Sequence, residues 1–574
     1  MDQPALFDKH SFVKETIFHF KAFVLTRQRW INNLVSALPK AHTNDSLADL
    51  PIISVSESQL WNDNDTPDNW VLTAGKIQNL RIAAKKINGI EISPGQVFSF
   101  WKCVGKPSRL KGYVIGREIR EGCIVPTIAG GLCQLSNALY DAALKAGFKI
   151  IERHKHTQVI KGSLAEQNRD ATVKWNYIDL RFNSGKAFRI EVELTSEKLI
   201  IKFRSNNTAI ERPINFTKHS KASKLNDCYS CGNYSCFKHP NPNSTFRPGA
   251  ITTYVLDEKW AEYDKYIKQH ATDNDFFIVP LHQSKFISSS RYNWTIKNKV
   301  NLKKLPFVAI DRAIRLGLFK NSNLFKLMLG FDKRLAKAAS KYIPIESTHL
   351  VISQNLLPFM FEQGALGGRT FDVLMNRLPF EQLHQTLDMA HAKYTNSKTL
   401  SDFRAPELLI DVENMALTKA EHIITPHQQI ADIFNNKAIK LNWVFPPANN
   451  TQLKGTKVLF PASALGRKGA YEIKELAQQL NLTIVVTGKA TEYDNFWGNV
   501  KIEMPGSNIF DGVGLVIYPA YIEHRPLVLL RALAAGIPVI TTQACGLQPT
   551  QNLTILPTDN FELLKQAVKT HFIN

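Results

Sequence analysis

The chain has 574 residues, of which 44% are hydrophobic and 21% are charged, and its formal net charge is +21. A chain of this length cannot form one core, so about three or four domains are expected. Lys14, Lys21 and Arg27 interrupt the Phe-rich segment 12–38, which excludes a membrane-spanning helix there. No basic and then apolar leader with a small-residue cleavage site follows Met1, so we expect a cytoplasmic protein.

The charge and the cysteine content narrow the partners and the compartment. The excess of Lys and Arg predicts an acidic partner, either nucleic acid, an anionic membrane face or a phosphorylated substrate, unless the protein is merely basic. No basic dimerising helix or aromatic-basic RNA motif is present, which argues against nucleic acid. Peripheral contact with the anionic inner membrane face would also explain the charge. Seven cysteines, an odd number, fit a reducing compartment better than a disulfide framework.

Five segments are expected along the chain, because the composition and the apolar pattern of the sequence change at four places. Residues 1–50 are a basic helical leader, whose apolar residues either pack on the body of the protein or contact a membrane surface. Residues 51–220 form an α+β domain that ends in the alternating strands FRIEVEL and LIIKFRS. Residues 221–249 are a cysteine-rich linker. Residues 250–449 and 450–574 alternate short apolar strands with helices.

The stretch from Gly130 to Gly147, GGLCQLSNALYDAALKAG, places one cysteine where a loop becomes a helix. Its apolar residues recur with helical spacing, and Gly147 is a C-terminal stop. Cys133 therefore lies at the helix start, where the dipole and the unpaired amides favour a thiolate.

This stretch and its surroundings resemble one family. The segments EISPGQVFSF, GYVIGREI, GGLCQLSNALYDAAL, GFKIIERHKH and DATV follow one another in the order found in the VanW family. The resemblance covers residues 72–182. It implies that residues 51–220 contain a VanW-like domain.

Two hypotheses apply to the thiol. In the first, Cys133 is a nucleophile, His156 is its base and Asp170 orients the imidazole, an order similar to that of transglutaminases and papain-like enzymes. His154 competes with His156 for the role of base. In the second, Cys133 only packs against the loop. Two other cysteines, Cys103 and Cys123, are expected in the core, and Cys545, beside Gly546, is expected to line a ligand pocket.

Four residues of the linker have the spacing of a metal site. Cys228, Cys231, Cys236 and His239 form C-x2-C-x4-C-x2-H. Three thiolates and one imidazole complete a tetrahedral shell, which predicts structural zinc. An iron–sulfur cluster is the main alternative, and thiols without a metal are the third.

The part after residue 250 predicts two Rossmann-like domains that face each other. The strands AITTYVL, DFFIVPL, HLVISQN, HIITP, KVLFP, LTIVVTG, GLVIYP and IPVITT read as strands buried on both faces, which is typical of parallel sheets. The fold class is therefore multidomain α/β: an α+β domain followed by two doubly wound domains. Ligands bind such sheets at the carboxyl ends of the strands.

The last block resembles the donor domain of GT-B glycosyltransferases of family 4. The similar segments are SALGRKGAYEIKEL, VVTG, VIYPAYIEHRPLVLLRALAAGIPVI and ACGL. The resemblance implies that Arg467 and Lys468 contact the donor diphosphate, that Gly469 opens the next helix, and that Glu523 lies near the sugar. The family has a second glutamate eight residues on, at the ribose, where this chain has Arg531. Arginine cannot accept the ribose hydroxyl hydrogens, so the donor or the activity differs here.

Polar residues of the preceding domain are candidates for acceptor or phosphate contact. Gln354 follows a strand, and Gly368 and Arg369 form a Gly-Gly-Arg loop. A structural ion pair is the alternative for Arg369.

These patterns predict a nucleotide-sugar-dependent glycosyltransferase, retaining and metal-independent, fused to a VanW-like domain and acting on an envelope glycan or a lipid-linked acceptor. A scaffold that holds nucleotide or glycan without turnover is the alternative that Arg531 favours. A thiol enzyme centred on Cys133 and acting on an envelope peptide or glycan is the third.

Overall fold

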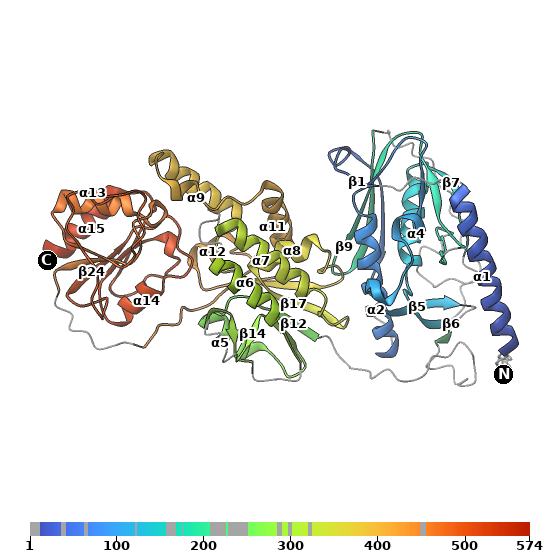
Figure 1. Ribbon diagram of the computed structural model, residues 1–574, viewed down its shortest axis with the longest axis horizontal. Helices are drawn as coiled ribbons and strands as arrows, with labels where there is room; N and C mark the ends of the chain where they lie inside the picture. Colours follow the sequence, from blue (N-terminus) through green and yellow to red (C-terminus); the bar gives the residue numbers. More distant parts are fainter. Residues whose placement is uncertain are drawn as a thin grey trace. The chain divides into compact units, whose positions relative to one another are not determined.

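The computed structural model describes residues 12–35, 42–61, 67–120, 123–155, 168–175, 177–206, 226–227, 251–283, 290–296, 301–318, 324–447 and 455–573. Two compact units follow from the contacts between residues. The first contains residues 1–251, 344–348 and 363–370, and the second contains 252–343, 349–362 and 371–574. Figure 1 shows the elements of both units along the chain. Among the described helices, none has the length and apolarity that a bilayer crossing requires.

The first unit is an α+β domain built on a five-stranded antiparallel sheet in the order β1-β3-β9-β10-β2. The burial of β9 and β10 alternates, as expected for strands with one face on the core. The strands are β1 His42–Thr43, β2 Ile52–Gln59, β3 Ile90–Ile92, β9 Phe188–Leu194 and β10 Lys198–Arg204.

Two smaller sheets and the helices complete this unit. One sheet has the order β4-β8-β7 and the other β11-β6-β5. Their strands are β4 Val97–Ser99, β5 Ile115–Arg120, β6 Cys123–Ile128, β7 Lys149–Glu152, β8 Arg181–Asn183 and β11 Asn226–Asp227. The helices are α1 Phe12–Val35, α2 Pro67–Ile87, α3 Phe100–Val104, η1 Arg109–Lys111 and α4 Cys133–Lys145. The expected helix that begins at Cys133 is confirmed.

The core of the first unit is aromatic. Phe148 and Phe203 stack with ring centroids 5.4 Å apart, and Phe98 and Phe182 stack at 4.6 Å. Phe188 contacts this group and is fully buried. Rings of this size bury large apolar areas, so they contribute much of the hydrophobic stabilisation.

The second unit contains two doubly wound sheets. The first has the order β16-β13-β12-β17-β18-β19-β20, and the second has β23-β22-β21-β24-β25-β26, with all five neighbouring pairs parallel. In each sheet the strand order reverses beside the first strand, which creates a topological switch point between β12 and β17 and another between β21 and β24. The two expected Rossmann-like folds are therefore confirmed.

The expected strands are present, and the structure adds five more to the two sheets: β16, β18, β20, β23 and β26. The strands of the first sheet are β12 Ile251–Val255, β13 Phe276–Val279, β16 Leu302–Lys304, β17 Ser347–Ser353, β18 Thr370–Leu374, β19 Ile423–Thr425 and β20 Ala438–Lys440. Its helices are α5 Ala261–His270, α6 Pro306–Leu318, α7 Leu324–Ala339, α8 Leu357–Glu362, α9 Phe380–Lys393, α10 Lys398–Ser401, α11 Glu407–Lys419 and α12 Gln428–Ile433. Short elements are β14 Leu281–His282, β15 Asn293–Trp294, η3 Ser290–Tyr292 and η4 Gln354–Leu356.

The second sheet is covered by helices on both faces, with α13 and α14 on opposite sides of it (Figure 1). Its strands are β21 Lys457–Phe460, β22 Ile484–Val486, β23 Ile502–Glu503, β24 Val513–Tyr518, β25 Val539–Thr542 and β26 Leu553–Leu556. Its helices are η5 Gly466–Lys468, α13 Ala470–Leu480, α14 Leu527–Ala534, η6 Gln543–Cys545 and α15 Phe561–Ile573.

Candidate functional site

The loop after β21 is held against the segment after β24 by backbone contacts. The Arg467 carbonyl accepts hydrogen bonds from the amides of Tyr521 (3.1 Å) and Ile522 (3.3 Å). Gly469 has φ 80°, and a Cβ there would lie 2.2 Å from the Pro519 carbonyl oxygen. Only glycine fits both demands. The strand order and this close approach bring the two predicted motifs together at the switch point.

Lys468 and Glu523 form an ion pair at this switch point. The Lys468 ammonium lies 2.8 Å from Glu523 Oε2, which also accepts a hydrogen bond from the Tyr518 hydroxyl at 2.5 Å. The Arg525 amide donates to Glu523 Oε1 at 2.9 Å. Burial raises the pKa of Glu523, but the Lys468 cation and these hydrogen bonds outweigh burial and lower it. Glu523 is therefore an ionised carboxylate with its orientation fixed.

Arg467 lies beside this pair, with its guanidinium 4.7 Å from the centre of the Phe403 ring. Burial lowers the pKa of Arg467. Phe403 has φ 61°, a left-handed conformation that is unfavourable for a bulky side chain. Such strained residues cluster at ligand sites, where the surroundings hold them in place. Phe403 therefore positions Arg467 at the carboxyl edge of the second sheet.

His427 joins the two sheets of the second unit, which the sequence did not reveal. It follows β19, and its Nε2 lies 3.2 Å from the carbonyl oxygens of both Glu523 and Ala544. A Cβ on Gly546 would lie 2.3 Å from the His427 ring. Burial lowers the pKa of His427 to about 4, so the imidazole is neutral. In the sequence, only the positions of His427 after the strand HIITP and of Gly546 in ACGL could have indicated this contact.

Arg531, in the position of the family's second glutamate, lies on α14. Its side chain is exposed, and its guanidinium lies 5.7 Å from the centre of the Phe510 ring. A role of position 531 at the ribose stays a prediction.

The three candidates of the preceding domain do not lie together in one unit. Gln354 is buried, and its Oε1 accepts hydrogen bonds from the amides of Asn376 and Arg377. Gly368 and Arg369 belong to the first unit. A Cβ on Gly368 would lie 2.5 Å from Ile77 Cγ2, which explains the glycine by packing.

Arg369 has a structural environment. Its guanidinium donates to the carbonyl oxygens of Pro344, Ser347 and Ala365 at 3.0, 2.8 and 2.7 Å. Burial lowers its pKa to about 9. Its donors therefore bind three backbone carbonyls, which gives no support to phosphate binding and favours a structural role.

Glycines allow the backbones of the VanW-like motifs to pack closely together in the first unit. A Cβ on Gly130 would lie 2.4 Å from the Gly116 carbonyl oxygen, and one on Gly75 would lie 2.0 Å from that of Ile115. The buried Asn79 amide donates to the carbonyl oxygens of Val114 and Gly130 at 3.1 and 3.0 Å. These contacts lock α2, β5 and the turn before α4 together.

The segment 169–173 is fastened along α4, which brings it to Cys133. Asn137 Oδ1 accepts from the Ala171 amide at 2.8 Å, and Ser136 Oγ donates to the Ala171 carbonyl at 2.5 Å. Cys133 Sγ lies 3.6 Å from Thr172 Oγ1 and 3.8 Å from the Val173 carbonyl oxygen. The helix start thus faces the DATV segment.

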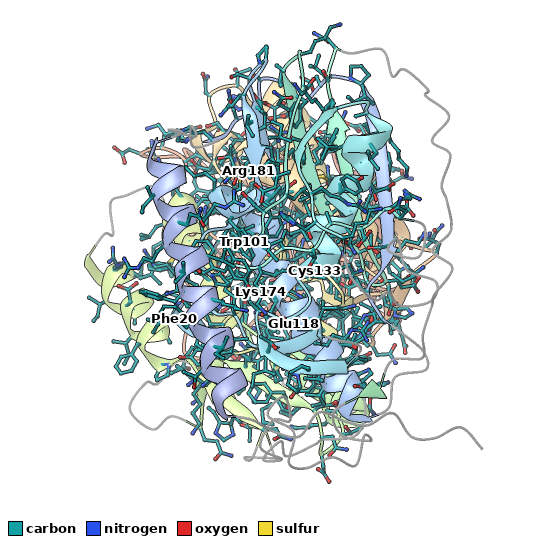
Figure 2. The ribbon with its side chains drawn as sticks, turned by 90° about the vertical axis from the view of Figure 1, so that its right-hand side faces the viewer. Phe20, Trp101, Glu118, Cys133, Lys174 and Arg181 are labelled. Carbon is teal, nitrogen blue, oxygen red and sulfur yellow. The ribbon has the colours of Figure 1, made fainter. Side chains whose placement is uncertain are left out.

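The two residues that follow the DATV segment, Lys174 and Trp175, contact other elements of the first unit. Lys174 Nζ lies 2.7 Å from Glu118 Oε1, and the rings of Trp101 and Trp175 meet edge to face at 5.4 Å. Figure 2 labels Lys174, Glu118 and Trp101 together with Cys133.

The proposed partners of the thiol are only partly described. His156 lies outside the described residues. His154 is exposed, and its Nε2 lies 3.3 Å from Glu152 Oε1. Asp170 is buried and accepts from Arg153 at 2.7 Å. The orienting role of Asp170 therefore stays a prediction, with Arg153 as a contact of its carboxylate.

The other cysteines differ in environment. Burial, with Asp179 nearby, raises the pKa of Cys103 to about 12, and burial with Glu523 raises that of Cys545 to about 12. Cys545 is buried beside Thr541, whose hydroxyl lies 3.0 Å from the sulfur. The Cys123 side chain and the predicted metal ligands Cys228, Cys231, Cys236 and His239 are outside what the structure describes.

Comparison with known proteins supports the first unit's resemblance. Residues 75–204 match the family model described as VanW like protein, so the chain contains a VanW-like domain. The Vancomycin B-type resistance protein VanW of Enterococcus faecalis is 33% identical over 153 residues, which are 25% of this chain. The chain spans 54% of the length of that relative.

Solved structures resemble the second unit at low identity. A sucrose-phosphate synthase from Thermosynechococcus elongatus is 13% identical, with a TM-score of 0.33, covering 57% of this chain and 90% of that one. A lipopolysaccharide outer core galactosyltransferase, WaaB, is 10% identical, with a TM-score of 0.31, covering 56% and 89%. At these values the likeness does not determine the activity of this chain.

Proposed function

We propose that the second unit is a nucleotide-sugar-dependent glycosyltransferase of the GT-B, family 4-like type, acting in cell-envelope glycan synthesis. The observation that carries this is the Arg467, Lys468 and Glu523 cluster at the switch point of the second sheet. Cations at the carboxyl ends of parallel strands fit a diphosphate, whose charge grows as the sugar leaves. The proposed acceptor is an envelope glycan or a lipid-linked sugar.

In this proposal each residue has a role. Arg467 and Lys468 bind the diphosphate and stabilise its developing charge. Glu523 lies near the sugar, where its fixed carboxylate accepts a sugar hydroxyl. Transfer would retain the anomeric configuration and need no metal ion, in keeping with the family resemblance.

The Lys468–Glu523 pair also favours a second candidate, a scaffold that holds nucleotide or glycan without turnover. A bound diphosphate must share Lys468 with Glu523, and Arg531 replaces the ribose-binding acid. A thermal-shift screen against nucleotide sugars, followed by a transfer assay with each stabilising sugar, separates the candidates. Ligands that bind the folded state raise its stability with their concentration and affinity. Stabilisation without transfer supports the scaffold, and stabilisation by none contradicts both.

A third candidate concerns the first unit alone. We propose that Cys133 is the nucleophile of a thiol enzyme that acts on an envelope peptide or glycan, with His156 or His154 as base. The observation in its favour is the sulfur at the first residue of α4, facing Thr172 and Val173. The alternative, in which Cys133 only packs, predicts no enhanced reactivity.

For the linker we propose a structural zinc held by Cys228, Cys231, Cys236 and His239. Metal analysis of the purified protein should give a thiolate-bound zinc that Cys231→Ser releases. Iron with sulfide would support the cluster alternative and contradict zinc.

We also propose that α1 contacts an anionic membrane at the cytoplasmic face. Arg29 fastens the helix on one side, through Glu152 at 2.8 Å and the Tyr177 carbonyl at 3.1 Å. Large apolar side chains are exposed elsewhere along it: Ile17, Phe20, Phe23, Val24, Leu25 and Ile31. Figure 2 labels Phe20 on this helix. Exposed apolar groups together with the net charge of +21 fit anionic lipid.

Vesicle sedimentation tests this contact. The protein should sediment with phosphatidylglycerol vesicles and less with phosphatidylcholine, and Phe20→Ser with Phe23→Ser should reduce the bound fraction several-fold. Leu110→Ser is the control, because Leu110 is fully exposed outside α1. Equal binding by the α1 variant and the control would rule the contact out.

A further inference from the structure

A cluster of two histidines and two carboxylates lies at the amino edge of the first sheet of the second unit. His349 is on β17 and Asp372 on β18, while Glu421 and His422 directly precede β19. The Glu421 amide donates to the Phe371 carbonyl at 2.9 Å, and the Val373 amide donates to the His422 carbonyl at 2.9 Å. The pairing of β18 with β19 therefore fixes the backbone beneath the cluster.

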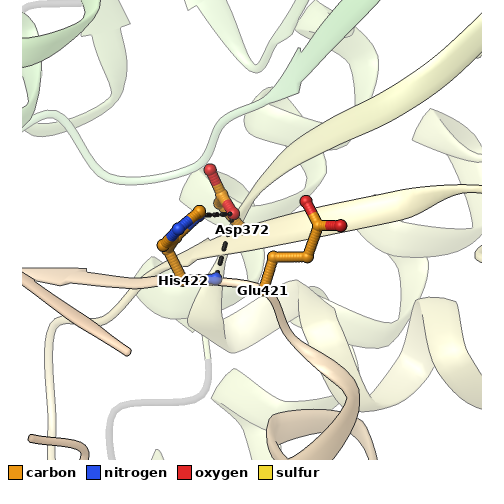
Figure 3. Close-up of side chains that lie close together, drawn as sticks. All are labelled: Asp372, Glu421 and His422. Atoms are coloured by element: carbon orange, nitrogen blue, oxygen red, sulfur yellow. Dashed lines mark hydrogen bonds and ion pairs between the residues drawn. The ribbon is translucent and has the colours of Figure 1, made fainter. Parts of the chain in front are cut away.

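The side chains converge. His422 Nδ1 lies 2.9 Å from Asp372 Oδ1, and His349 Nε2 lies 3.3 Å from Asp372 Oδ2. His349 Nδ1 lies 3.7 Å from Glu421 Oε2. One ligand atom each of Asp372, Glu421 and His422 lies within 4.8 Å of the other two. Figure 3 shows Asp372 and His422 turned toward one another, with the Glu421 carboxylate beside them.

The charges of the cluster are unbalanced. The Asp372 carboxylate contacts both His349 and His422, and the Glu421 carboxylate contacts His349. In the described ranges, neither Asp372 nor Glu421 has a lysine or arginine within ion-pair distance. Two neighbouring carboxylates with only imidazoles beside them attract a cation.

We propose that Asp372, Glu421 and His422 bind a divalent first-row transition-metal ion of the Zn²⁺ type. One imidazole nitrogen and carboxylate oxygens are ligands that Zn²⁺ and Co²⁺ accept. With metal–ligand bonds of about 2.0–2.1 Å, neighbouring ligands of a tetrahedral ion are about 3.3 Å apart. His422 Nδ1 and Asp372 Oδ1 are joined by a hydrogen bond of 2.9 Å, whose proton the ion would replace. The ligand atoms of the three residues now lie within 4.8 Å of one another, so binding would draw them closer together.

His349 has a positioning role in this site. It contacts both carboxylates from β17 and holds them in place, as outer hydrogen bonds do around metal ligands. Arg377 and His427 follow β18 and β19 at the opposite, carboxyl edge of the sheet. The inference therefore does not depend on the proposed glycosyltransferase activity, because the metal would not take part in transfer.

Cobalt titration of the full-length protein tests the proposal. Co²⁺ bound to oxygen and nitrogen ligands gives visible absorption bands without thiolate charge-transfer absorption. Co²⁺ at the cysteine-rich linker would show that absorption, so the spectrum distinguishes the two sites. Wild type should bind one Co²⁺ of the thiolate-free kind, and Zn²⁺ should displace it. His422→Ala should weaken this binding by at least about 10-fold, and His349→Ala by about 10-fold.

The controls keep the result interpretable. His270→Ala removes an exposed imidazole on α5 and should bind Co²⁺ like wild type. Asp372→Asn retains an oxygen that can accept the hydrogen bond from the His422 amide. This variant therefore tests the contribution of the negative charge to Co²⁺ binding while the backbone contact is kept. Thermal unfolding of each variant without metal verifies folding. Equal thiolate-free Co²⁺ binding by wild type and folded His422→Ala would overturn the proposal, as would no such binding by wild type.

Discussion

The two regions that the sequence singled out owe their shape to different forces. Around Cys133 the motif residues are mainly packing devices, because Gly75, Gly116 and Gly130 let backbones approach closely. At the second switch point the motif residues are charged, and they assemble into the Lys468–Glu523 pair beside Arg467. The residues of a sequence motif can therefore serve close backbone packing in one region and chemistry in another. Substitutions around Cys133 should therefore change stability first, and substitutions at the charged cluster should change ligand binding and turnover first.

The largest effect is expected at the charged site. Lys468→Ala should lower the turnover of any transfer that the screen identifies by about 10²-fold or more, because it removes a cation required in the transition state. Lys474→Ala, on the adjoining α13, is the matched control and should retain turnover. Steady-state kinetics decides, and equal turnover in the two variants would contradict the assignment of the donor site.

The packing region should respond in stability. Gly130→Ala forces a methyl group to within 2.4 Å of the Gly116 carbonyl oxygen, so it should lower the free energy of unfolding of the first unit by about 3 kcal/mol. Gly185→Ala is the control, because a Cβ there meets no atom within 4 Å. Denaturant unfolding of both variants measures the difference. A Gly130→Ala protein as stable as the control would show that the glycines are not packing devices.

The reactivity of the Cys133 thiol tests whether the first region has a chemical role as well as a structural one. If Cys133 is a nucleophile, iodoacetamide should modify it about 10-fold faster at neutral pH than Cys103 or Cys545, because burial raises the pKa of both of these thiols to about 12. Peptide mass spectrometry over time gives the rates. Labelling of Cys133 no faster than of these two would leave it a packing residue.

Variants identify the base. His156→Ala should slow the labelling, and His154→Ala is its matched partner two residues away. Asp170→Asn should slow it less, through misorientation of the imidazole, and unfolding must be measured beside it because Asp170 also holds Arg153.

The smallest effect is expected at Arg531. Arg531→Glu restores the family's acid on an exposed face of α14, so the fold should be unchanged and the preference among nucleotide sugars should shift a few-fold. Competition between donors in the transfer assay measures the preference. An identical preference would show that position 531 does not contact the ribose.

Much of the fold follows from local pattern, and little of the site does. Apolar runs such as KVLFP and GLVIYP predicted the strands β21 and β24, because burial on both faces leaves a local signature. β18 was not singled out, since its five residues follow a glycine-rich loop directly. The hydrogen bonds of Arg369 to three carbonyls depend on segments distant in sequence, so an arginine in a Gly-Gly-Arg loop read as a ligand contact.

The same limit applies to the ion pair and to His427. The resemblance gave Lys468 and Glu523 separate roles, but their 2.8 Å contact requires β21 and β24 to be neighbours in the sheet. The packing of His427 against Gly546 joins segments more than a hundred residues apart. Contacts between elements remote in sequence leave no periodicity, and only the three-dimensional structure gives them.

Calorimetric titration with nucleoside diphosphates tests the central claim most directly, because it asks whether the Arg467 and Lys468 switch point is a diphosphate site without assuming turnover. We expect that UDP, ADP or GDP binds the full-length protein and that Arg467→Ala weakens that binding by at least about 10-fold, a loss of about 1.4 kcal/mol. Lys474→Ala should leave the binding unchanged. Binding of none of the three, or equal binding by wild type and a folded Arg467→Ala protein, would contradict it.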